Sequence, residues 1–424
     1  MATNDLDVNT IHTGDCLEVM ADLPAESVHA CVTDPPYGLA FMGNSWDDFE
    51  PKEYQEWCEQ WAREVKRVLK PGGHMLSFSG TRTYHRLGVG VEDAGFEIRD
   101  KIDWLYGSGF PKALDVSKAI DKQADAEREV VNTKDVGPDM TGGNYENNDG
   151  DRAVQEITEP ATDAAEQWDG FKTALKPAHE PVCVARKPFS QTVAENVQEH
   201  GTGALNIDGC RIDTDGRPDI DHGTESETRF TSSGDEGELP GSKHVGQTTE
   251  GRYPANVVFD EQAAEQLDRD VGELGESNGV RGLGNSDKYG SGDGYMNTMD
   301  NPKTGQNVGF GDTGGPSRYF YTSKATKAER TLDGQIENDH PTVKPTDLME
   351  WLVKLVTAEG QIVLDPFAGS GTTCMAAKNL NREFIGIEQN ERYADIARVR
   401  CGLTPNDPSV VRDDDGQEGL EAFE

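Results

Sequence analysis

The sequence is poor in basic residues and contains no long apolar run. Its 424 residues include 40 Lys and Arg against 78 Asp and Glu, which gives a formal net charge of -38. No apolar run approaches the roughly eighteen residues of a membrane-spanning helix. The N-terminus MATNDLDVNT also lacks the basic and apolar regions of a signal peptide. These absences predict a soluble cytoplasmic protein with no membrane partner.

Closely spaced cysteine pairs are missing as well. The seven cysteines are an odd number, and they include no C-x-x-C pair. This pattern argues against a disulfide framework and against a zinc site, and it fits a reducing compartment. We therefore expect no metal site.

The acidic residues are spread along the whole chain rather than gathered in one tail. Three interpretations compete: a disordered acidic protein, a mimic of nucleic acid, and a protein adapted to high salt. Apolar runs and periodic helices at both ends argue against disorder there, whereas the middle of the chain fits it better. The scatter favours salt adaptation and a halophilic source. In molar salt the Debye length is only about 3 Å, so such a surface repels itself weakly.

Both ends of the chain alternate between strand and helix patterns. In residues 1–106, SVHACVT, HMLSF and FEIRDKIDWLYG predict strands, and KEYQEWCEQWAREVKRVLK has the apolar spacing of a helix. From about residue 338, helices are predicted for HPTVKPTDLMEWLVKLVT, GSGTTCMAAKNL and NERYADIARVRC, and strands for QIVLDPF and EFIGIE. This rhythm indicates an α/β fold in which both ends contribute to one parallel sheet.

The middle of the chain, residues 107–337, differs in composition. It is rich in Gly, Asp, Glu, Asn, Ser and Thr, and only islands such as GFPKALDVSKAIDK, HEPVCVARKPF, GALNIDGCRI and RYPANVVF have the pattern of ordered structure. We predict a large irregular insertion with flexible acidic loops. Residues 403–424 are expected to form an acidic tail.

The stretch VLDPFAGSGTT, residues 363–373, has the pattern of a nucleotide-type cofactor site. A strand leads into a glycine-bearing turn and a helix, and the next strand ends at Glu388, where an acid suits ribose hydroxyls. Gly369 and Gly371 lack the third glycine of the dinucleotide fingerprint, and no P-loop lysine follows. Asp365 stands where a pyrophosphate would arrive, so a cationic ligand such as S-adenosylmethionine fits better. The alternative is an ordinary strand-to-helix turn.

The tetrapeptide Asp34-Pro35-Pro36-Tyr37 directly follows a predicted strand. Two prolines stop regular structure and make the turn stiff. A carboxylate and a carbonyl fixed at this end of a strand can accept both hydrogens of an exocyclic amine, so that methyl transfer is accelerated by positioning and preorganised electrostatics. Tyr37 can stack on a base swung out of a helix. Taken alone, the tetrapeptide fits a rigid turn equally well.

Three separate motifs in one order resemble those of the amino-group DNA methyltransferases, which modify N6 of adenine or N4 of cytosine. They are GDCLEVMADLPAESVHACVTDPPYGL, HPTVKP and DPFAGSGTT. With the catalytic motif first, the order resembles that of the beta subgroup, and WLYGSGFPKALDVSKAIDK and KPAHEPVCVARKPF are similar to phage and prophage methylases. The resemblance implies a seven-stranded, Rossmann-like, circularly permuted sheet, with DNA methylation of the restriction-modification type.

The resemblance also implies roles for parts of the chain. Residues 1–106 would be the catalytic half, residues 107–337 the target-recognition region and residues 338–402 the cofactor-binding half. The residues expected to handle the target base are Asp34, Pro35, Pro36 and Tyr37. Those expected to bind S-adenosylmethionine are Asp15, Lys344, Asp365, Phe367, Gly369, Gly371, Thr372 and Glu388. Asp15 would lie near the adenine of the cofactor, and Lys344 would border its pocket.

Adenine N6 is the favoured target, because cytosine-N4 members of the resembled family mostly carry Ser where this chain has Asp34. Enzymes that methylate RNA or protein glutamine usually begin the tetrapeptide with Asn. A catalytically inactive DNA-binding protein is a further alternative, against which the intact motifs argue.

The expected partners are double-stranded DNA with a flipped base and, in a homodimer, a second copy of this chain. Two basic clusters predict a groove that binds DNA phosphates. The first contains Arg186 and Lys187, and the second contains Arg318, Lys324, Lys327 and Arg330. The second cluster fits a solvated linker equally well.

Overall fold

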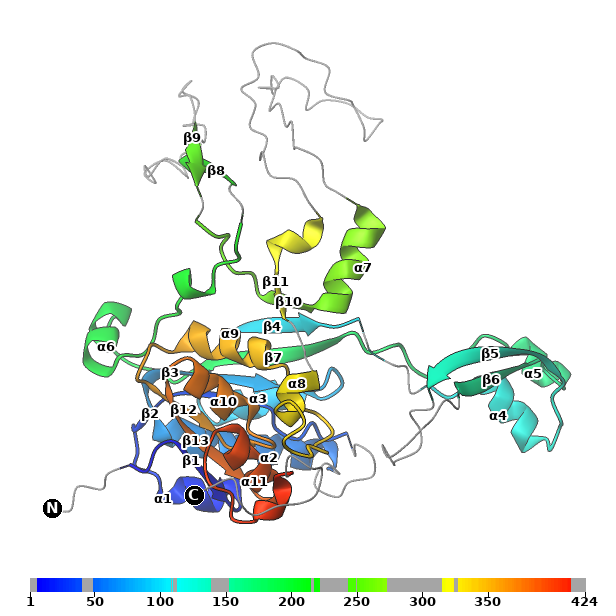
Figure 1. The fold of residues 1–424 in the computed structure, drawn as a ribbon, viewed down its shortest axis with the longest axis horizontal. Coiled ribbons are helices and arrows are strands. Elements are labelled where there is room, and N and C mark those ends of the chain that lie inside the picture. Colours follow the sequence, from blue (N-terminus) through cyan, green and yellow to red (C-terminus); the bar gives the residue numbers. More distant parts are fainter. Residues whose placement is uncertain are drawn as a thin grey trace, which may run out of the picture. The chain divides into compact units, whose positions relative to one another are not determined.

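The computed structural model describes residues 6–39, 49–107, 109, 113–138, 152–214, 217–221, 243–248, 250–272, 315–323 and 327–412. The chain divides into two compact units, one formed by residues 1–107 with 179–424 and the other by residues 108–178. Figure 1 shows the elements of both. Among the helices of the described residues, none is both long and apolar enough to cross a membrane.

The first unit is built on one large sheet. The strands, in spatial order, are β1 (Thr10–Thr13), β13 (Glu383–Glu388), β12 (Ile362–Asp365), β2 (Val28–Thr33), β3 (Leu69–Phe78), β7 (His179–Arg186), β4 (Glu97–Leu105), β10 (Val257–Asp260) and β11 (Tyr321–Ser323). β12 pairs with β2 through Val363 opposite Ala30 and Leu364 opposite Cys31. This pairing confirms that the two ends of the chain form one sheet.

The sheet differs from the expected one in two respects. In the described residues it has nine strands rather than seven, and it is mixed rather than parallel, since β7 runs antiparallel to both β3 and β4. β7, β10 and β11 come from the segment for which an irregular insertion was expected. The run Val182–Ala185 is buried between two strands, because a continuous apolar run suits the centre of a sheet whichever way its strand points.

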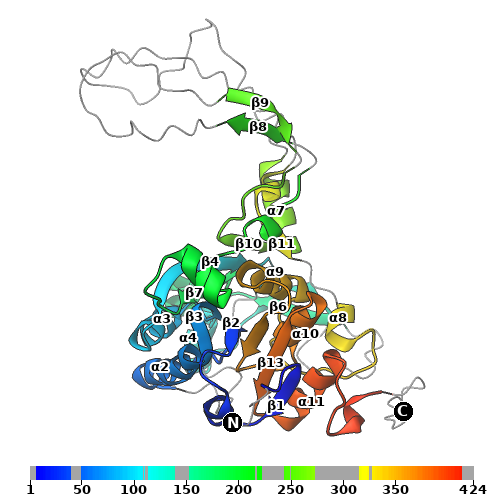
Figure 2. The same ribbon diagram turned by 90° about the vertical axis from the view of Figure 1, so that its left-hand side faces the viewer.

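Helices cover both faces of this sheet, as Figure 2 shows for α2 and α3 on one side and α9 and α10 on the other. Side chains of a strand alternate between faces. Ala30 and Val32 accordingly join one apolar core with α9 and α10, and Cys31 joins a second core with α1, α2 and α3. Val28 also belongs to the second core, because the register of β2 against β3 shifts between Val28 and Ala30. The helices are α1 (Cys16–Asp22), α2 (Pro51–Val68), α3 (Tyr84–Asp93), α6 (Val193–His200), α7 (Glu261–Val271), α8 (Lys327–Thr331), α9 (Thr346–Val356), α10 (Thr372–Asn379) and α11 (Glu391–Arg400).

Shorter elements complete the first unit. A separate two-stranded ribbon is formed by β8 (Arg217–Asp221) and β9 (Lys243–Thr248). The 3₁₀ turns are η3 (Asp208–Cys210), η5 (Pro316–Tyr319) and η6 (Pro408–Val410). All seven cysteines are buried with free thiols.

The second unit contains α4 (Val116–Gln123), the antiparallel pair β5 (Val130–Pro138) and β6 (Arg152–Thr158), and α5 (Asp163–Gln167). Its centre is the buried carboxylate of Asp121, which accepts hydrogen bonds from Arg128 Nη1 at 2.6 Å, from the Ala161 amide at 2.9 Å and from the Thr162 hydroxyl at 2.7 Å. The partners satisfy the buried charge, so Asp121 ties the helix to the chain that follows β6.

Candidate functional site

The carboxyl ends of three neighbouring parallel strands meet at one edge of the sheet. β2 ends next to Asp34, β12 ends at Asp365 and β13 ends at Glu388. The hydroxyl of Thr33 donates to Asp365 Oδ1 at 2.6 Å. Thr33 and Asp365 are 332 positions apart in the sequence, and their hydrogen bond joins the ends of the two strands that carry the predicted motifs.

The turn that follows β2 is anchored on α2. Pro35 is buried, and the hydroxyl of Tyr54 donates to the Pro36 carbonyl at 3.0 Å. Gly38 has a φ of +65°, and a Cβ there would lie 2.7 Å from the Tyr54 ring. This close packing, added to the stiffness of two prolines, fixes the positions from which Asp34 and Tyr37 project.

Four side chains form a closed polar group, which we call the Asp34 cluster: Asp34, Tyr37, Glu180 and Lys344. The Tyr37 hydroxyl lies 2.7 Å from Asp34 Oδ1 and 2.9 Å from Glu180 Oε2. The Lys344 ammonium lies 2.5 Å from Asp34 Oδ2 and 3.2 Å from Glu180 Oε2. Its nitrogen also lies 4.9 Å from the centre of the Phe78 ring, which encloses it further.

The charges of the Asp34 cluster support one another. Burial alone would lower the pKa of Lys344, but the carboxylates of Asp34 and Glu180 outweigh burial and raise it. Burial, followed by the same two carboxylates, raises the pKa of the Tyr37 hydroxyl. Lys344 is therefore a charged donor and Tyr37 a neutral one at ordinary pH.

The predicted cofactor turn presents a buried carboxylate. Asp365 accepts from the Thr33 hydroxyl and from the Phe367 amide, the latter at 3.1 Å. Burial raises the pKa of Asp365 to about 6, although these two hydrogen bonds and a third from Thr373 act to lower it. Among the described residues no Lys or Arg forms an ion pair with Asp365. A buried acid without a cation fits a positively charged ligand group.

Glu388 and the glycine turn are connected through the backbone. The Gly369 amide donates to Glu388 Oε2 at 2.9 Å, and the Asn390 amide donates to Glu388 Oε1 at 2.8 Å. Burial raises the pKa of Glu388. Gly371 has a φ of +83°, and a Cβ there would lie 2.8 Å from the Ala397 Cβ. The turn is thus a tight backbone cradle with an acid on either side, which fits a ligand such as S-adenosylmethionine that carries an amino group and a ribose.

The other predicted cofactor residues have structural contacts. Asp15 caps α1 through the Leu17 amide at 2.9 Å and follows Gly14, whose amide donates to the Glu388 carbonyl at 3.0 Å. Asp15 therefore lies at the same edge of the sheet.

Two residues of the glycine turn and the helix after it are held by packing and hydrogen bonding. Phe367 packs on Trp57 and Trp61, with ring centres 5.4 Å apart in both cases. The Thr372 hydroxyl accepts a hydrogen bond from the buried Arg400 at 3.0 Å. Lys344 lies against Asp34 and Tyr37 of the tetrapeptide that is predicted to be catalytic.

Sequence reasoning missed Glu180. It assumed parallel strands, whose amino ends lie on the far edge of the sheet. Because β7 is antiparallel, its first residues lie beside the ends of β2 and β3, which brings Glu180 to Tyr37. An acid separated by one proline from the apolar run at 182–185 was the available signal, and the direction of the strand was the missing information.

The two predicted basic clusters are engaged within the protein. Arg186 donates to Glu97 at 2.8 Å and Lys187 donates to the Leu69 carbonyl at 2.7 Å. Arg318 donates to the Gly315 carbonyl at 2.7 Å, and Arg330 donates to the carbonyls of Asn338 and His340. Lys324 and the Lys327 side chain lie outside the described residues. The basic groove stays a prediction.

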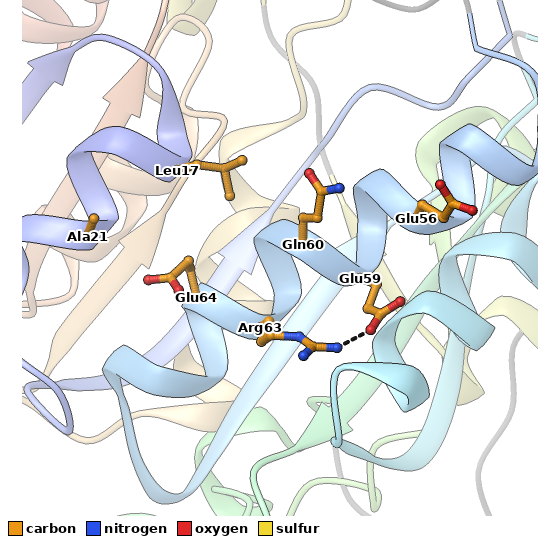
Figure 3. Close-up of a pocket in the computed structure, with 7 residues that line it drawn as sticks. All are labelled: Leu17, Ala21, Glu56, Glu59, Gln60, Arg63 and Glu64. Carbon is orange, nitrogen blue, oxygen red and sulfur yellow. Dashed lines mark hydrogen bonds and ion pairs between the residues drawn. The ribbon is translucent and has the colours of Figure 1, made fainter.

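A hollow of about 610 Å³ lies between α1 and α2. Figure 3 shows its lining, in which Arg63 pairs with Glu59 and three further side chains are acidic or amide-bearing. The lining residues are Leu17, Ala21, Glu56, Glu59, Gln60, Arg63 and Glu64. It contains none of the predicted site residues. The described residues also contain no group of three His, Cys, Asp or Glu suited to a metal ion.

Comparison with known proteins identifies the family. The sequence pattern of the N6/N4 family, described as DNA methylase, matches residues 28–399. The chain is 24% identical to the type II methyltransferase M.HindIII of Haemophilus influenzae over 437 residues, covering 94% of this chain and 97% of that protein. It is 52% identical to the type II methyltransferase M2.DpnII of Streptococcus pneumoniae over 80 residues, which are 19% of this chain and 28% of that one.

Solved structures of such enzymes align along most of the chain. The PvuII DNA methyltransferase, titled cytosine-N4-specific, has a TM-score of 0.44 at 15% identity and covers 94% of this chain and 87% of its own. The M1.HpyAVI–SAM complex has a TM-score of 0.38 at 16% identity, with 93% and 99% covered. Since the family pattern extends over most of its sequence, this protein belongs to the N6/N4 family of DNA methylases, which transfer a methyl group from S-adenosylmethionine to an amino group of adenine or cytosine in DNA.

Proposed function

We propose that this protein methylates the N6 amino group of adenine at specific sites in double-stranded DNA. The observation that carries the proposal is Asp34, a carboxylate fixed at the end of β2 and joined to the cofactor turn through Thr33 and Asp365. A carboxylate at this position is the feature that favours adenine over cytosine.

The proposed catalytic residues act on the target amine. The amine of adenine is conjugated with its ring and is a weak nucleophile. Asp34 and the Pro35 carbonyl accept its two hydrogens, which favours the pyramidal form with a free lone pair, and Pro36 keeps the turn rigid. Tyr37 stacks on the flipped base. These groups accelerate the reaction by orientation and by charges already in place, so no covalent enzyme intermediate is needed.

The proposed cofactor residues surround the glycine turn. Bound S-adenosylmethionine supplies the methyl group from its sulfonium. Asp365 faces the amino group, Glu388 binds the ribose hydroxyls and Asp15 lies near the adenine. The remaining contributors are Phe367, Gly369, Gly371 and Thr372 in the turn, with Lys344 at the border of the pocket.

The nature of the product tests the proposal. The protein is expressed in a host without DNA methylation, and the host DNA is digested to nucleosides and analysed by mass spectrometry. N6-methyladenine is the expected product, and N4-methylcytosine in its place would overturn the choice of base. DNA without either product would contradict the proposed activity. Long-read sequencing of the same DNA then gives the recognition site.

Binding of S-adenosylmethionine should strengthen as pH rises through about 6. A cationic amino group prefers the ionised form of Asp365, whose pKa burial raises to about 6. Below that pH the carboxyl must first lose a proton, which costs up to about tenfold in affinity per pH unit. Titration calorimetry at about pH 5 and about pH 7.5 measures the change. Asp365→Asn is the control and should flatten the profile; an equal slope in that variant would assign it to another group.

The order and the extent of the motifs support further assignments. The tetrapeptide precedes the cofactor turn in the chain, which supports the beta subgroup and a circularly permuted sheet. We assign residues 1–106 to catalysis, residues 338–402 to the cofactor and residues 403–424 to an acidic tail. Residues 107–337 are assigned to target recognition, apart from β7, β10 and β11, which are strands of the central sheet. The similarity to type II methyltransferases supports a restriction-modification setting.

Salt adaptation gives a separate prediction. A net charge of -38 should destabilise the fold at low ionic strength, and screening should remove that repulsion. Raising KCl from about 0.1 M to about 2 M should increase Tm and leave methyl transfer active, as the Debye length falls to a few Å. Calorimetry in KCl measures Tm, with an equally concentrated sucrose series as a control for osmolyte effects. An activity optimum at low salt would rule out the halophilic source.

A further inference from the structure

Both oxygens of the Asp34 carboxylate are already occupied. Oδ1 lies 2.7 Å from the Tyr37 hydroxyl and Oδ2 lies 2.5 Å from the Lys344 ammonium. In the proposed function an incoming amine needs one of these oxygens as an acceptor. Each oxygen has a second lone pair, so the amine could share an oxygen with the donor already there, but that oxygen is a stronger and more accessible acceptor once the donor withdraws.

Glu180 is within reach of the same two donors. Its Oε2 lies 2.9 Å from the Tyr37 hydroxyl and 3.2 Å from the Lys344 ammonium. A tyrosine has one hydroxyl hydrogen, so it can donate to only one of the two carboxylates at a time. Asp34 and Glu180 are thus alternative acceptors for Tyr37, whereas the three hydrogens of the Lys344 ammonium can reach both carboxylates.

We propose that Glu180 is a positioning residue that takes over the hydrogen bonds of Tyr37 and Lys344 when the target amine engages Asp34. This inference rests on the proposed function. Both donors already lie within 3.2 Å of Glu180 Oε2, so the exchange occurs between acceptors that they already contact.

The surroundings of Lys344 make a second acceptor necessary. The residue is 8% exposed, and its nitrogen lies over the rings of Phe78 and Tyr37. A buried ammonium that released its only carboxylate would be costly, because little water is present to solvate it. Glu180 keeps the ammonium paired throughout. Without it, Lys344 would stay on Asp34 and compete with the substrate.

The test compares Glu180→Gln in two backgrounds by single-turnover methyl transfer. We expect the variant to lower the transfer rate by at least about tenfold in the otherwise wild-type protein. The Kd for S-adenosylmethionine and the KM for DNA should stay within about twofold. In a Lys344→Met background the same change should cost less than about threefold, because no ammonium remains to be moved. A merely structural role predicts equal losses in both backgrounds.

Glu97→Gln is the matched control. Glu97 lies opposite Arg186 at the other end of β7 and pairs with it, outside the proposed site. It should leave transfer unchanged. If Lys344→Met alone abolishes transfer, the two backgrounds cannot be compared, and Glu180→Gln is judged by its kcat and KM. A lower kcat with an unchanged KM supports the inference, and an unchanged kcat contradicts it. If Glu180→Gln fails to fold, Glu180→Asp replaces it, and a wild-type rate in that variant overturns the inference.

Two outcomes separate this inference from the function on which it rests. A wild-type protein that leaves DNA unmethylated contradicts the proposed function. A wild-type protein that methylates DNA while Glu180→Gln does so at the same rate leaves the function standing and overturns the role of Glu180.

Discussion

Replacing Asp34 with alanine should lower methyl transfer by at least about 10²-fold, the size of effect seen when one preorganised polar group is removed from an active site. The variant removes an acceptor for the target amine and also leaves Lys344 with Glu180 as its carboxylate partner. Binding of S-adenosylmethionine should change by less than about twofold, since the glycine turn is untouched. Transfer of tritiated methyl groups to DNA and calorimetric binding measure the two effects.

Two controls accompany this variant. Asp34→Asn keeps the shape of the side chain, so a loss of similar size would assign the effect to the charge. Asp100→Ala removes an exposed carboxylate from β4 and should leave transfer unchanged. If Asp34→Ala methylates DNA at the wild-type rate, the catalytic assignment is wrong.

Replacing Gly371 with alanine should destabilise the protein by about 3 kcal/mol, from about 1–2 kcal/mol of left-handed backbone strain and a similar cost of overpacking. Its φ is +83°, and the added methyl would lie 2.8 Å from the Ala397 Cβ and 2.9 Å from the Ala397 Cα. Either α11 or the turn must move. Binding of S-adenosylmethionine should weaken, because the turn is the proposed cradle.

Gly360→Ala separates the two contributions. Gly360 also has a left-handed φ, +74°, but no atom lies within 4 Å of the added Cβ. Its substitution should therefore cost about 1 kcal/mol, from backbone strain alone. Urea denaturation of both variants gives the difference. Equal destabilisation would mean that contact with Ala397 contributes nothing.

The sequence was sufficient to bring Asp34 and Asp365 together. Asp34 directly follows one predicted strand, and Asp365 ends another. Because parallel strands place their carboxyl ends at one edge of a sheet, the pattern alone predicts that the two acids lie close together. Fold class was equally accessible, since the helices and strands of both ends have clear apolar periodicity. The number of strands was not, because β7, β10 and β11 lie in a polar segment, and β10 and β11 are only four and three residues long.

The Asp34 cluster shows why the rest could not be predicted. Lys344 and Asp34 are 310 positions apart, and a lysine before a proline most often starts a solvated helix. Only packing against Phe78 reveals that its ammonium is buried. Glu180 depends on the direction of β7, which an apolar run does not encode. The burial of Lys344 and the position of Glu180 both depend on tertiary contacts that the local sequence pattern does not encode.

The register of β4 and β7 has a consequence for how this enzyme can vary. Leu105 pairs with His179, so the two strands form a hairpin in which residues 106–178, including all of the second unit, take the place of the turn. The closure of the hairpin depends on the strands and only weakly on the length of the connection. This segment can lengthen, shorten or be exchanged while Glu180, the second residue of β7, keeps its place beside Tyr37. The fold thus places an exchangeable segment one residue before the strand position that contacts Tyr37.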